Sequence, residues 1–122
     1  MLRVTVLKVS AQAVAGSGSV RHDDVAGSRA RALLADPDRL ADADCLVVVA
    51  GRDAALVATL GALTDVPVVA VPTSAGSPAG MGGLGALLTM LHSAAPGVSV
   101  VDVDNGWSAG VFAARVARRA AR

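Results

Sequence analysis

Apolar residues fall into short runs that alternate along the chain with polar or glycine-bearing segments. Four of these runs are rich in valine and have the length of β-strands: Leu2–Val9, Cys45–Ala50, Val66–Val71 and Val98–Val103. In the first run, Leu2, Val4 and Val6 fall on one side. The second and third runs are apolar on both faces, which is the pattern of central strands in a parallel sheet.

Helical segments are predicted between and after these strands. They are Val25–Leu34, a short turn over Asp38–Ala43, Arg52–Leu63, Leu84–Leu91 and Trp107–Arg119. Leu56, Leu60 and Leu63 recur at helical spacing. The segment Leu84–Leu91 is apolar nearly all round, which predicts a buried helix. The small, glycine-bearing segment Ser10–Ser19 is either a loop or a poorly formed helix.

The alternation of strands and helices predicts an α/β fold. This order is typical of a parallel sheet with helices on both faces, joined by right-handed crossovers. A chain of 122 residues is long enough to bury one core. Because no internal repeat or linker divides it, we expect a single domain over residues 1–122.

The segment 66–101 contains no Asp, Glu, Lys or Arg in thirty-six residues. Four prolines interrupt it, and proline removes a backbone donor and stops a helix, so no membrane-spanning helix is expected. Its glycine-rich part, 73–83, joins a central strand to the helix Leu84–Leu91. A nearly uncharged segment of this size is hard for a small monomer to cover, and it predicts an oligomer assembled through Gly82–Leu91.

The composition excludes several classes of protein. Hydrophobic residues make up 53% of the chain and charged residues 17%, unlike a disordered protein. A net charge of +1 is too balanced to indicate nucleic-acid binding. The arginines near the C-terminus either complement the negative end of the last helix or form a phosphate-binding cluster. The single Cys45 excludes an internal disulfide and, with no signal peptide in view, we expect a cytoplasmic protein.

Small, flexible residues follow three of the predicted strands. They are Gly51, the run Thr73-Ser74-Ala75-Gly76 and the pair Asn105-Gly106. Glycines permit positive φ and leave amides exposed, so these segments are either simple turns or phosphate-binding loops at helix N-termini. Because open α/β sheets bind ligands at the carboxyl ends of their strands, we expect a concave site where the three loops meet.

The acidic residues near these loops have alternative interpretations. Asp53 lies on the first turn of a predicted helix, where a carboxylate either interacts with the helix dipole or serves in a site. Asp102 and Asp104 lie two apart on a predicted strand, so they share a face and can bind Mg²⁺ together with a substrate phosphate. Alternatively, Asp104 or Asn105 forms an Asx turn or caps the last helix.

No resident metal site is predicted. His22 lies in a polar loop and His92 ends the helix Leu84–Leu91, and neither has a Cys or His partner at metal-binding spacing. Cys45 begins an apolar strand and is predicted to be an inert core thiol.

Four separated segments resemble a known family. They are Val47-Val48-Val49-Ala50-Gly51, Val69-Ala70-Val71-Pro72-Thr73-Ser74, Gly82-Gly83-Leu84 and Asp104-Asn105-Gly106. In order and spacing they are similar to the C-terminal domain of LarB, the pyridinium-3,5-biscarboxylic acid mononucleotide synthase of nickel-pincer cofactor biosynthesis. That domain is related to AIR carboxylase of the N5-CAIR mutase type. The resemblance runs from Val25 to Ala117.

The resemblance implies a single flavodoxin-like three-layer α/β domain with a parallel sheet, truncated or altered at the N-terminus, in a homo-oligomer that is often an octamer. It implies carboxylation of nicotinic acid adenine dinucleotide with release of AMP, after a cysteine thiolate adds to the pyridinium ring. Loop amides and hydroxyls would hold phosphate and carboxylate groups. Asp53 stands where the family has an acidic residue, so the resemblance favours a catalytic role for it.

The chain departs from the family pattern at two chemical positions. Ala94 stands where the family has its nucleophilic cysteine, and Arg29 where it has a histidine. The Ser-Asp loop that follows the family's first strand is replaced by Ser10-Ala11-Gln12-Ala13. Two hypotheses follow: a divergent nucleotide-dependent carboxylase or lyase, and a non-catalytic relative that acts as a nucleotide-binding or scaffolding subunit. The sequence leaves open whether the protein is an enzyme.

The expected substrate-binding site combines residues from the ends of three strands: Gly51, Arg52, Thr73, Ser74, Gly76, Asp104, Asn105 and Gly106. Arg52 and Arg29 are the nearest candidates for a positive charge. We expect a nucleotide or free phosphate to bind there at modest affinity, because few charges take part. Neither nucleic acid nor a membrane is expected as a partner.

Overall fold

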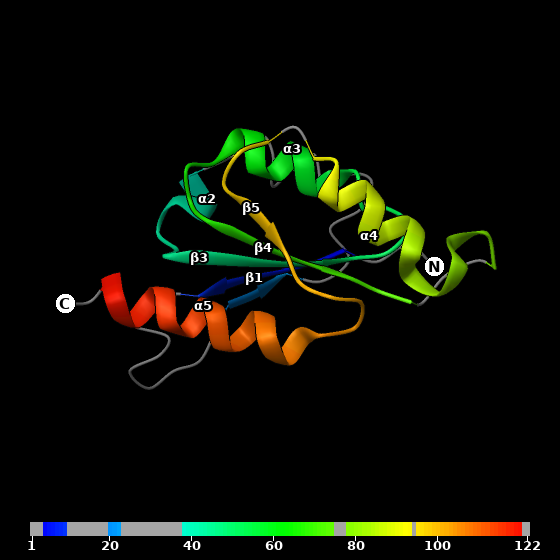
Figure 1. Ribbon diagram of the computed structural model, residues 1–122. Helices are drawn as coiled ribbons and strands as arrows, with labels where there is room; N and C mark the ends of the chain where they lie inside the picture. Colours follow the sequence, from blue (N-terminus) through cyan, green and yellow to red (C-terminus); the bar gives the residue numbers. More distant parts are fainter. Residues whose placement is uncertain (1–3, 10–19, 23–37, 75–77, 94, 121–122) are drawn as a thin grey trace.

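Five strands form one mixed sheet in the computed structural model, which describes residues 4–9, 20–22, 38–74, 78–93 and 95–120 (Figure 1). The strands are β1 (Val4–Val9), β2 (Val20–His22), β3 (Cys45–Ala50), β4 (Val68–Pro72) and β5 (Val98–Val100). Their order across the sheet is β2-β1-β3-β4-β5. The helices are α2 (Asp38–Ala41), α3 (Leu56–Leu63), α4 (Leu84–Leu91) and α5 (Gly106–Ala120), and a 3₁₀ segment covers Pro78–Gly83.

The strands β3, β4 and β5 run parallel, as the sequence predicts. Ala50 lies opposite Pro72 in the β3–β4 pair, and Ala70 lies opposite Val100 in the β4–β5 pair. Every residue of β4 is buried, and β3 has a single half-buried residue, Val49. Continuous apolar runs therefore became the central strands because helices cover both of their faces.

The predicted parallel arrangement does not extend to the first strand. β1 runs antiparallel to β3, with Val4 opposite Ala50, and β2 runs antiparallel to β1. A strand's apolar pattern specifies its faces and not its direction, and mixed sheets often carry antiparallel strands at one edge. His22, predicted to lie in a polar loop, ends β2. The predicted helix Val25–Leu34 and the segment Ser10–Ser19 lie outside the described residues.

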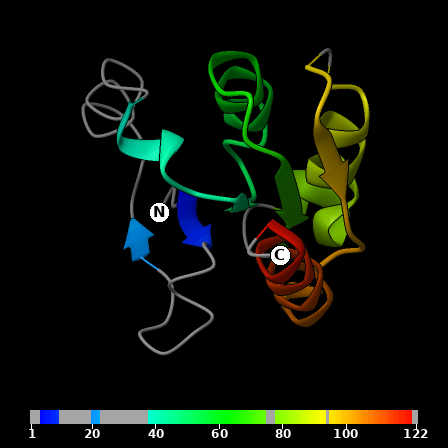
Figure 2. The ribbon, with the colours of Figure 1, turned by 90° about the vertical axis from the view of Figure 1, so that its left-hand side faces the viewer.

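The helices form two layers on opposite faces of the sheet. Figures 1 and 2 show α2, α3 and α4 on one face and α5 on the other. In the first layer Val57 and Leu60 of α3 pack with Val48 and Ala70 of the sheet. In the second layer, α5 turns a stripe of fully buried alanines towards the sheet, namely Ala109, Ala113 and Ala117. The three layers form the single α/β domain of flavodoxin type that the sequence predicts.

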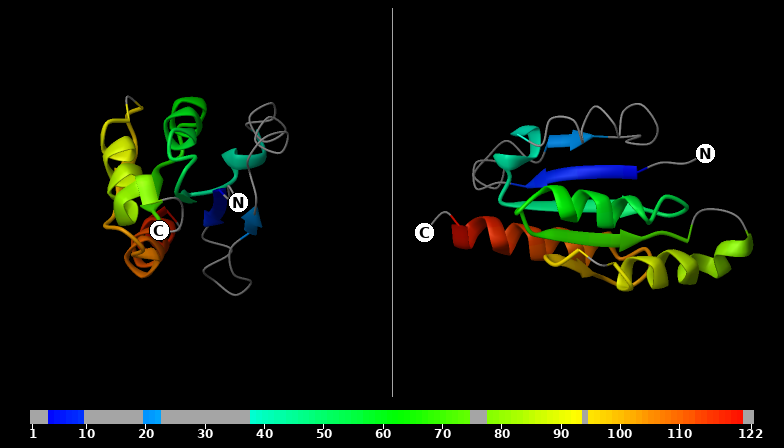
Figure 3. Two further views of the ribbon diagram at one scale, coloured as in Figure 1. Left: turned by 90° about the vertical axis from the view of Figure 1, so that its right-hand side faces the viewer. Right: turned by 90° about the horizontal axis from the view of Figure 1, so that it is seen from above.

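Helix α4 has the predicted bounds but is not buried all round. Ala86 and Met90 are buried against the sheet, whereas Leu84, Leu88 and Leu91 are exposed by 42%, 47% and 59%. Figure 3 shows why: α4 lies at the outer margin of its layer, beside the edge strand β5, with no described element beyond it. Hydropathy alone could not distinguish a central helix from one at the margin of a layer.

The uncharged segment 66–101 is divided among several elements, as its prolines predict. It contains β4, the 3₁₀ segment, α4 and β5. In the part of the chain that the structure describes, no helix combines the length and the hydropathy needed to cross a bilayer.

Gly83 is the N-cap residue of α4, and it lies very close to two other segments of the chain. Met81, Gly82 and Gly83 all have positive φ, at 52°, 67° and 99°. A Cβ added to Gly83 would lie 2.5 Å from Val103 Cγ1 and 3.2 Å from the Thr73 carbonyl oxygen. Glycine is required here both by the left-handed backbone and by the close approach of two other segments.

We expect Gly83→Ala to lower the free energy of unfolding by about 2–4 kcal/mol, because strain in the left-handed region adds to overpacking against Val103. Gly82→Ala is the matched control. Gly82 also has positive φ, at 67°, but a Cβ there meets nothing within 4 Å, so its loss should be about 1 kcal/mol. Urea unfolding measures both, and equal losses would contradict the role given to the Val103 contact.

Candidate functional site

The segments that follow β3, β4 and β5 lie beside one another at one edge of the sheet and form a row of loops. They begin at Gly51, Thr73 and Val101. The Thr73 N–H donates to the Ala50 carbonyl at 3.1 Å, and the Asp104 N–H donates to the Pro72 carbonyl at 2.8 Å. β5 itself ends at Val100, earlier than predicted, so the segment 101–104 continues beside β4 without regular strand structure. The predicted convergence of loops therefore has a physical basis in backbone hydrogen bonds.

Ser74 and Asp104 tie two of these loops together through side chains. The Ser74 N–H donates to Asp104 Oδ1 at 2.9 Å, and the Ser74 hydroxyl donates to Asp104 Oδ2 at 2.5 Å. One carboxylate thus accepts both donors of a residue thirty positions earlier in the chain. Hydrogen bonds to an ionised acceptor are the stronger kind, so this pair links the loop after β4 to the segment after β5 at the exposed side of the row.

Asp104 is suited to this contact by its backbone. Its φ is +61°, in the left-handed region that Asp tolerates better than most residues. The hydrogen bond from the Ser74 hydroxyl, and to a smaller extent the one from the Ser74 amide, holds the pKa of the Asp104 carboxyl below its ordinary value. Slight desolvation of the carboxyl raises the pKa and opposes this effect. Asp104 is exposed and therefore carries its negative charge at the rim of the site across the neutral pH range.

Asn105 caps the last helix, which confirms one of the alternatives for this region. Its Oδ1 accepts the Ser108 N–H at 3.1 Å, and its Nδ2 donates to Asp102 Oδ1 at 2.6 Å. Asp102 and Asp104 do not share the face of a strand, because β5 ends at Val100, and each carboxylate has a different partner. Their expected pairing around Mg²⁺ therefore loses its geometric basis.

The segment after β3 forms consecutive turns and not the predicted first helical turn. The Ala54 N–H donates to the Gly51 carbonyl at 3.1 Å, the Leu56 N–H donates to the Asp53 carbonyl at 2.9 Å, and α3 begins only at Leu56. Asp53 is half-buried ahead of the helix, and the first turn of α3 contains no acidic residue. Its interpretation as a carboxylate on the first turn was therefore wrong. Arg52 is exposed.

The remaining predicted residues are distributed as follows. Gly106 is the first residue of α5 and is exposed. Gly76, Arg29 and Ala94 lie outside the described residues. Among the residues that the structure describes, no three His, Cys, Asp or Glu side chains gather where they could hold a metal ion.

Cys45 is fully buried on the face of the sheet that α5 covers. Burial raises the pKa of its thiol to about 11, with a smaller opposing effect from its hydrogen bond to the Leu46 carbonyl. A buried thiol with a raised pKa is a poor nucleophile, so Cys45 is poorly suited to replace the cysteine that the resemblance to LarB leads one to expect at position 94.

Two features of the site were missed from the sequence. The first is Gly83, whose close approach to Val103 and Thr73 was not recognised within a glycine-rich loop. The second is the pair of hydrogen bonds between Ser74 and Asp104, two residues that were predicted as separate members of the site. A usable signal was present: in parallel strands the residues just past two neighbouring carboxyl ends meet at the same edge of the sheet.

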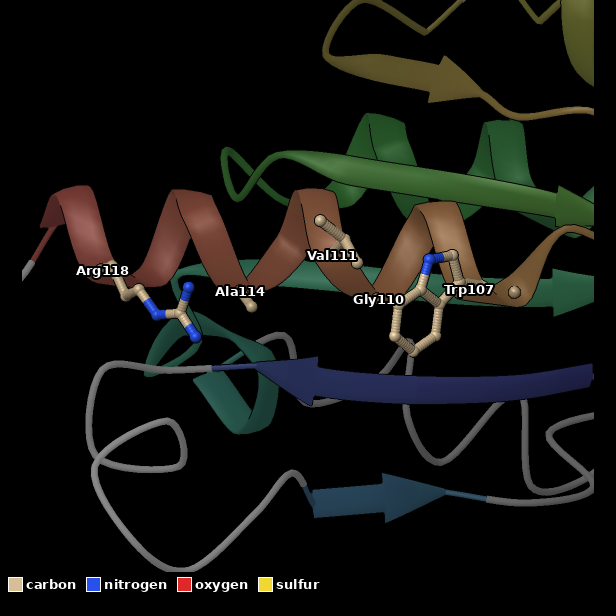
Figure 4. A pocket seen from close by; sticks show the side chains of 6 residues that line it. Trp107, Gly110, Val111, Ala114 and Arg118 are labelled. Atoms are coloured by element: carbon tan, nitrogen blue, oxygen red, sulfur yellow. The ribbon is translucent and has the colours of Figure 1, made fainter.

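A shallow depression of about 270 Å³ lies elsewhere, on the outer side of α5. Figure 4 shows Trp107, Val111, Ala114 and Arg118 along it. These residues occupy the side of α5 opposite its buried alanines, and Trp107 is exposed by 82%. The depression shares only Gly106 with the predicted site and contains neither Ser74 nor Asp104.

Comparison with known proteins shows the family of this chain. The sequence matches the AIR carboxylase family over residues 28–121, a range that includes β3, β4, β5 and every loop in the row. The protein MJ0165 of Methanocaldococcus jannaschii, itself uncharacterized, is 47% identical over 77 residues. Those residues cover 63% of this chain and 29% of the relative, so the chain spans less than a third of that protein. The family match covers well over half of the chain, which belongs to the AIR carboxylase family.

Proposed function

We propose that this protein binds a nucleotide at the carboxyl edge of β3, β4 and β5, through the phosphate or carboxylate oxygens of the ligand. The observation that carries the proposal is the Ser74–Asp104 contact, which sets the loop after β4 against the segment after β5. Gly51 lies in the same row, because its neighbour Ala50 accepts the Thr73 N–H. Loops at the carboxyl ends of the strands are the usual ligand sites of open α/β sheets.

The ligand class follows from the LarB-like segments around the row. Backbone N–H groups and hydroxyls supply the donors, and Arg52 supplies one exposed positive charge. Few positive charges beside the Asp104 carboxylate favour modest affinity. A pyridine nucleotide such as nicotinic acid mononucleotide, or the AMP part of the dinucleotide, is the candidate that the resemblance to LarB supports.

We do not favour the carboxylation reaction that the resemblance to LarB implies, because this chain lacks the thiol on which that reaction depends. Ala94 has no group that can add to a pyridinium ring, and the buried Cys45 belongs to a different element. The proposal is therefore nucleotide binding by a chain that lacks the cysteine nucleophile expected from the resemblance to LarB. Retention of the carboxylase reaction is the alternative that an activity assay distinguishes.

The binding site is tested by titrating AMP, nicotinic acid mononucleotide and inorganic phosphate into the protein in a calorimeter. We expect at least one to bind with a dissociation constant below the millimolar range, and Ser74→Trp to weaken it by about tenfold or more because the ring fills the row of loops. Ala62→Trp, at an exposed position of α3, is the matched control and should bind normally. If wild type binds none of the three ligands, or if Ser74→Trp binds as well as wild type, the site has been misplaced.

The activity is tested by incubating the protein with nicotinic acid adenine dinucleotide, bicarbonate and Mg²⁺. We expect no release of AMP above the rate without protein, since position 94 lacks the thiol. Chromatographic detection of AMP, formed by wild type and abolished in Asp53→Asn, would show instead that the carboxylase reaction survives.

We also propose that the exposed face of α4 joins copies of this chain. Leu84, Leu88 and Leu91 lie at positions i, i+4 and i+7 and so share one side of the helix, and Met81, three residues before Leu84 in the chain, is also exposed. Apolar residues clustered in this way mark an interaction surface more often than scattered ones do. The homo-oligomers to which the resemblance points would cover this face.

Light scattering after gel filtration tests the oligomer. At micromolar concentration we expect a mass of at least two chains, and Leu88→Glu to shift it towards one chain because a buried carboxylate would lack a partner. Thr89→Glu is the matched control on the same helix, at an exposed polar position. A wild-type protein that stays monomeric throughout the micromolar range would refute the proposal.

A further inference from the structure

Ser74, one of the predicted binding residues, has two hydrogen-bond donors, its N–H and its hydroxyl, and Asp104 accepts from both. Its N–H donates to Asp104 Oδ1 and its hydroxyl donates to Asp104 Oδ2, at 2.9 Å and 2.5 Å. A serine hydroxyl has a single hydrogen to donate, and the backbone has a single N–H. In this structure Ser74 therefore has no hydrogen left to donate to an incoming anion, because Asp104 accepts both of them.

The Asp104 carboxylate presents to Ser74 what a bound anion would present. It carries a negative charge on two oxygens, and each oxygen accepts one donor. Phosphate and carboxylate groups of a nucleotide make the same charge-assisted pair of hydrogen bonds. An anion that binds at Ser74 must either displace this carboxylate or approach within contact distance of its charge, and like charges at that distance repel.

We propose that Asp104 is an internal competitor for the ligand: its carboxylate occupies the Ser74 donors in the free protein and leaves them when an anionic nucleotide binds. This inference rests on the proposed function, because it concerns the same site. It assigns Asp104 an inhibitory role, in contrast to the substrate-contacting role expected from the sequence.

The surroundings of Asp104 permit such an exchange. The side chain is exposed, so water solvates the carboxylate once it leaves Ser74. The backbone bond from the Asp104 N–H to the Pro72 carbonyl, at 2.8 Å, holds the chain independently of the side chain. The cap on α5 comes from the next residue, Asn105, and does not involve Asp104. The side chain can thus rotate away while the row of loops keeps its alignment.

The test compares Asp104→Asn with wild type by titrating inorganic phosphate and AMP. Asn also tolerates positive φ and nearly keeps the shape of Asp, but it lacks the charge. Competition predicts that Asp104→Asn binds both probes about fivefold or more tightly than wild type, since a neutral acceptor holds the Ser74 donors less strongly. A direct contact between Asp104 and ligand hydroxyls predicts the opposite sign for AMP.

Asp102→Asn is the matched control for charge alone. It removes a carboxylate two residues away, which accepts from Asn105 and not from Ser74, and it keeps an oxygen for that bond. The inference predicts a change of less than about twofold, because this carboxylate holds no donor of Ser74. Equal tightening in the two variants would overturn the competition in favour of a general charge effect.

The outcomes separate this inference from the proposed function. Wild type that binds the probes while Asp104→Asn binds them equally or more weakly overturns the competition and leaves the nucleotide site standing. Binding to both proteins that is tighter in Asp104→Asn than in wild type supports both. If neither protein binds phosphate or AMP, and circular dichroism shows that both are folded, then the nucleotide site is wrong and the competition falls with it.

Discussion

The parallel pairing of β3 with β4 is the constraint on which the rest of the structure depends. It sets Ala50 opposite Pro72, and the segment after β5 is then aligned by the bond from the Asp104 N–H to the Pro72 carbonyl. A slip of one residue would turn every side chain of a strand to the opposite face. Both faces of β4 are buried, so side-chain packing on both faces favours this register. The register in turn places the loops that follow the strands beside one another.

The parts of the fold that could be predicted are those where burial produces a recognisable pattern of apolar residues in the sequence. Cys45–Ala50 is a strand with the predicted bounds because an apolar run between polar ends fits only a covered strand. The direction of β1 could not be predicted, since its pattern is the same read along either direction. The exposure of Leu88 on α4 could not be predicted either, because it depends on where the layer ends and not on the helix itself.

The convergence of the loops at the candidate site was predictable, but their contacts were not. Strand order and the small residues Gly51, Thr73 and Ser74 indicated that these loops meet at one edge of the sheet. The contact between Ser74 and Asp104 depends on a non-glycine residue with φ of +61° thirty positions later in the sequence, and no local pattern marks it. Asp53 shows the converse, because a helix expected from residue 52 begins at Leu56 and leaves that carboxylate in a turn.

The alanine stripe of α5 has a consequence for how the protein can change over evolution. Alanine loses no side-chain entropy when it is buried, and its small size lets a helix lie close to the sheet. A larger residue at Ala109 cannot be accommodated by a change of rotamer in a neighbour; it must push the helix axis outwards. Since Asn105 and Asp104 lead directly into α5, that displacement would reach the loops, so a buried position in the core also limits which residues keep the loops aligned.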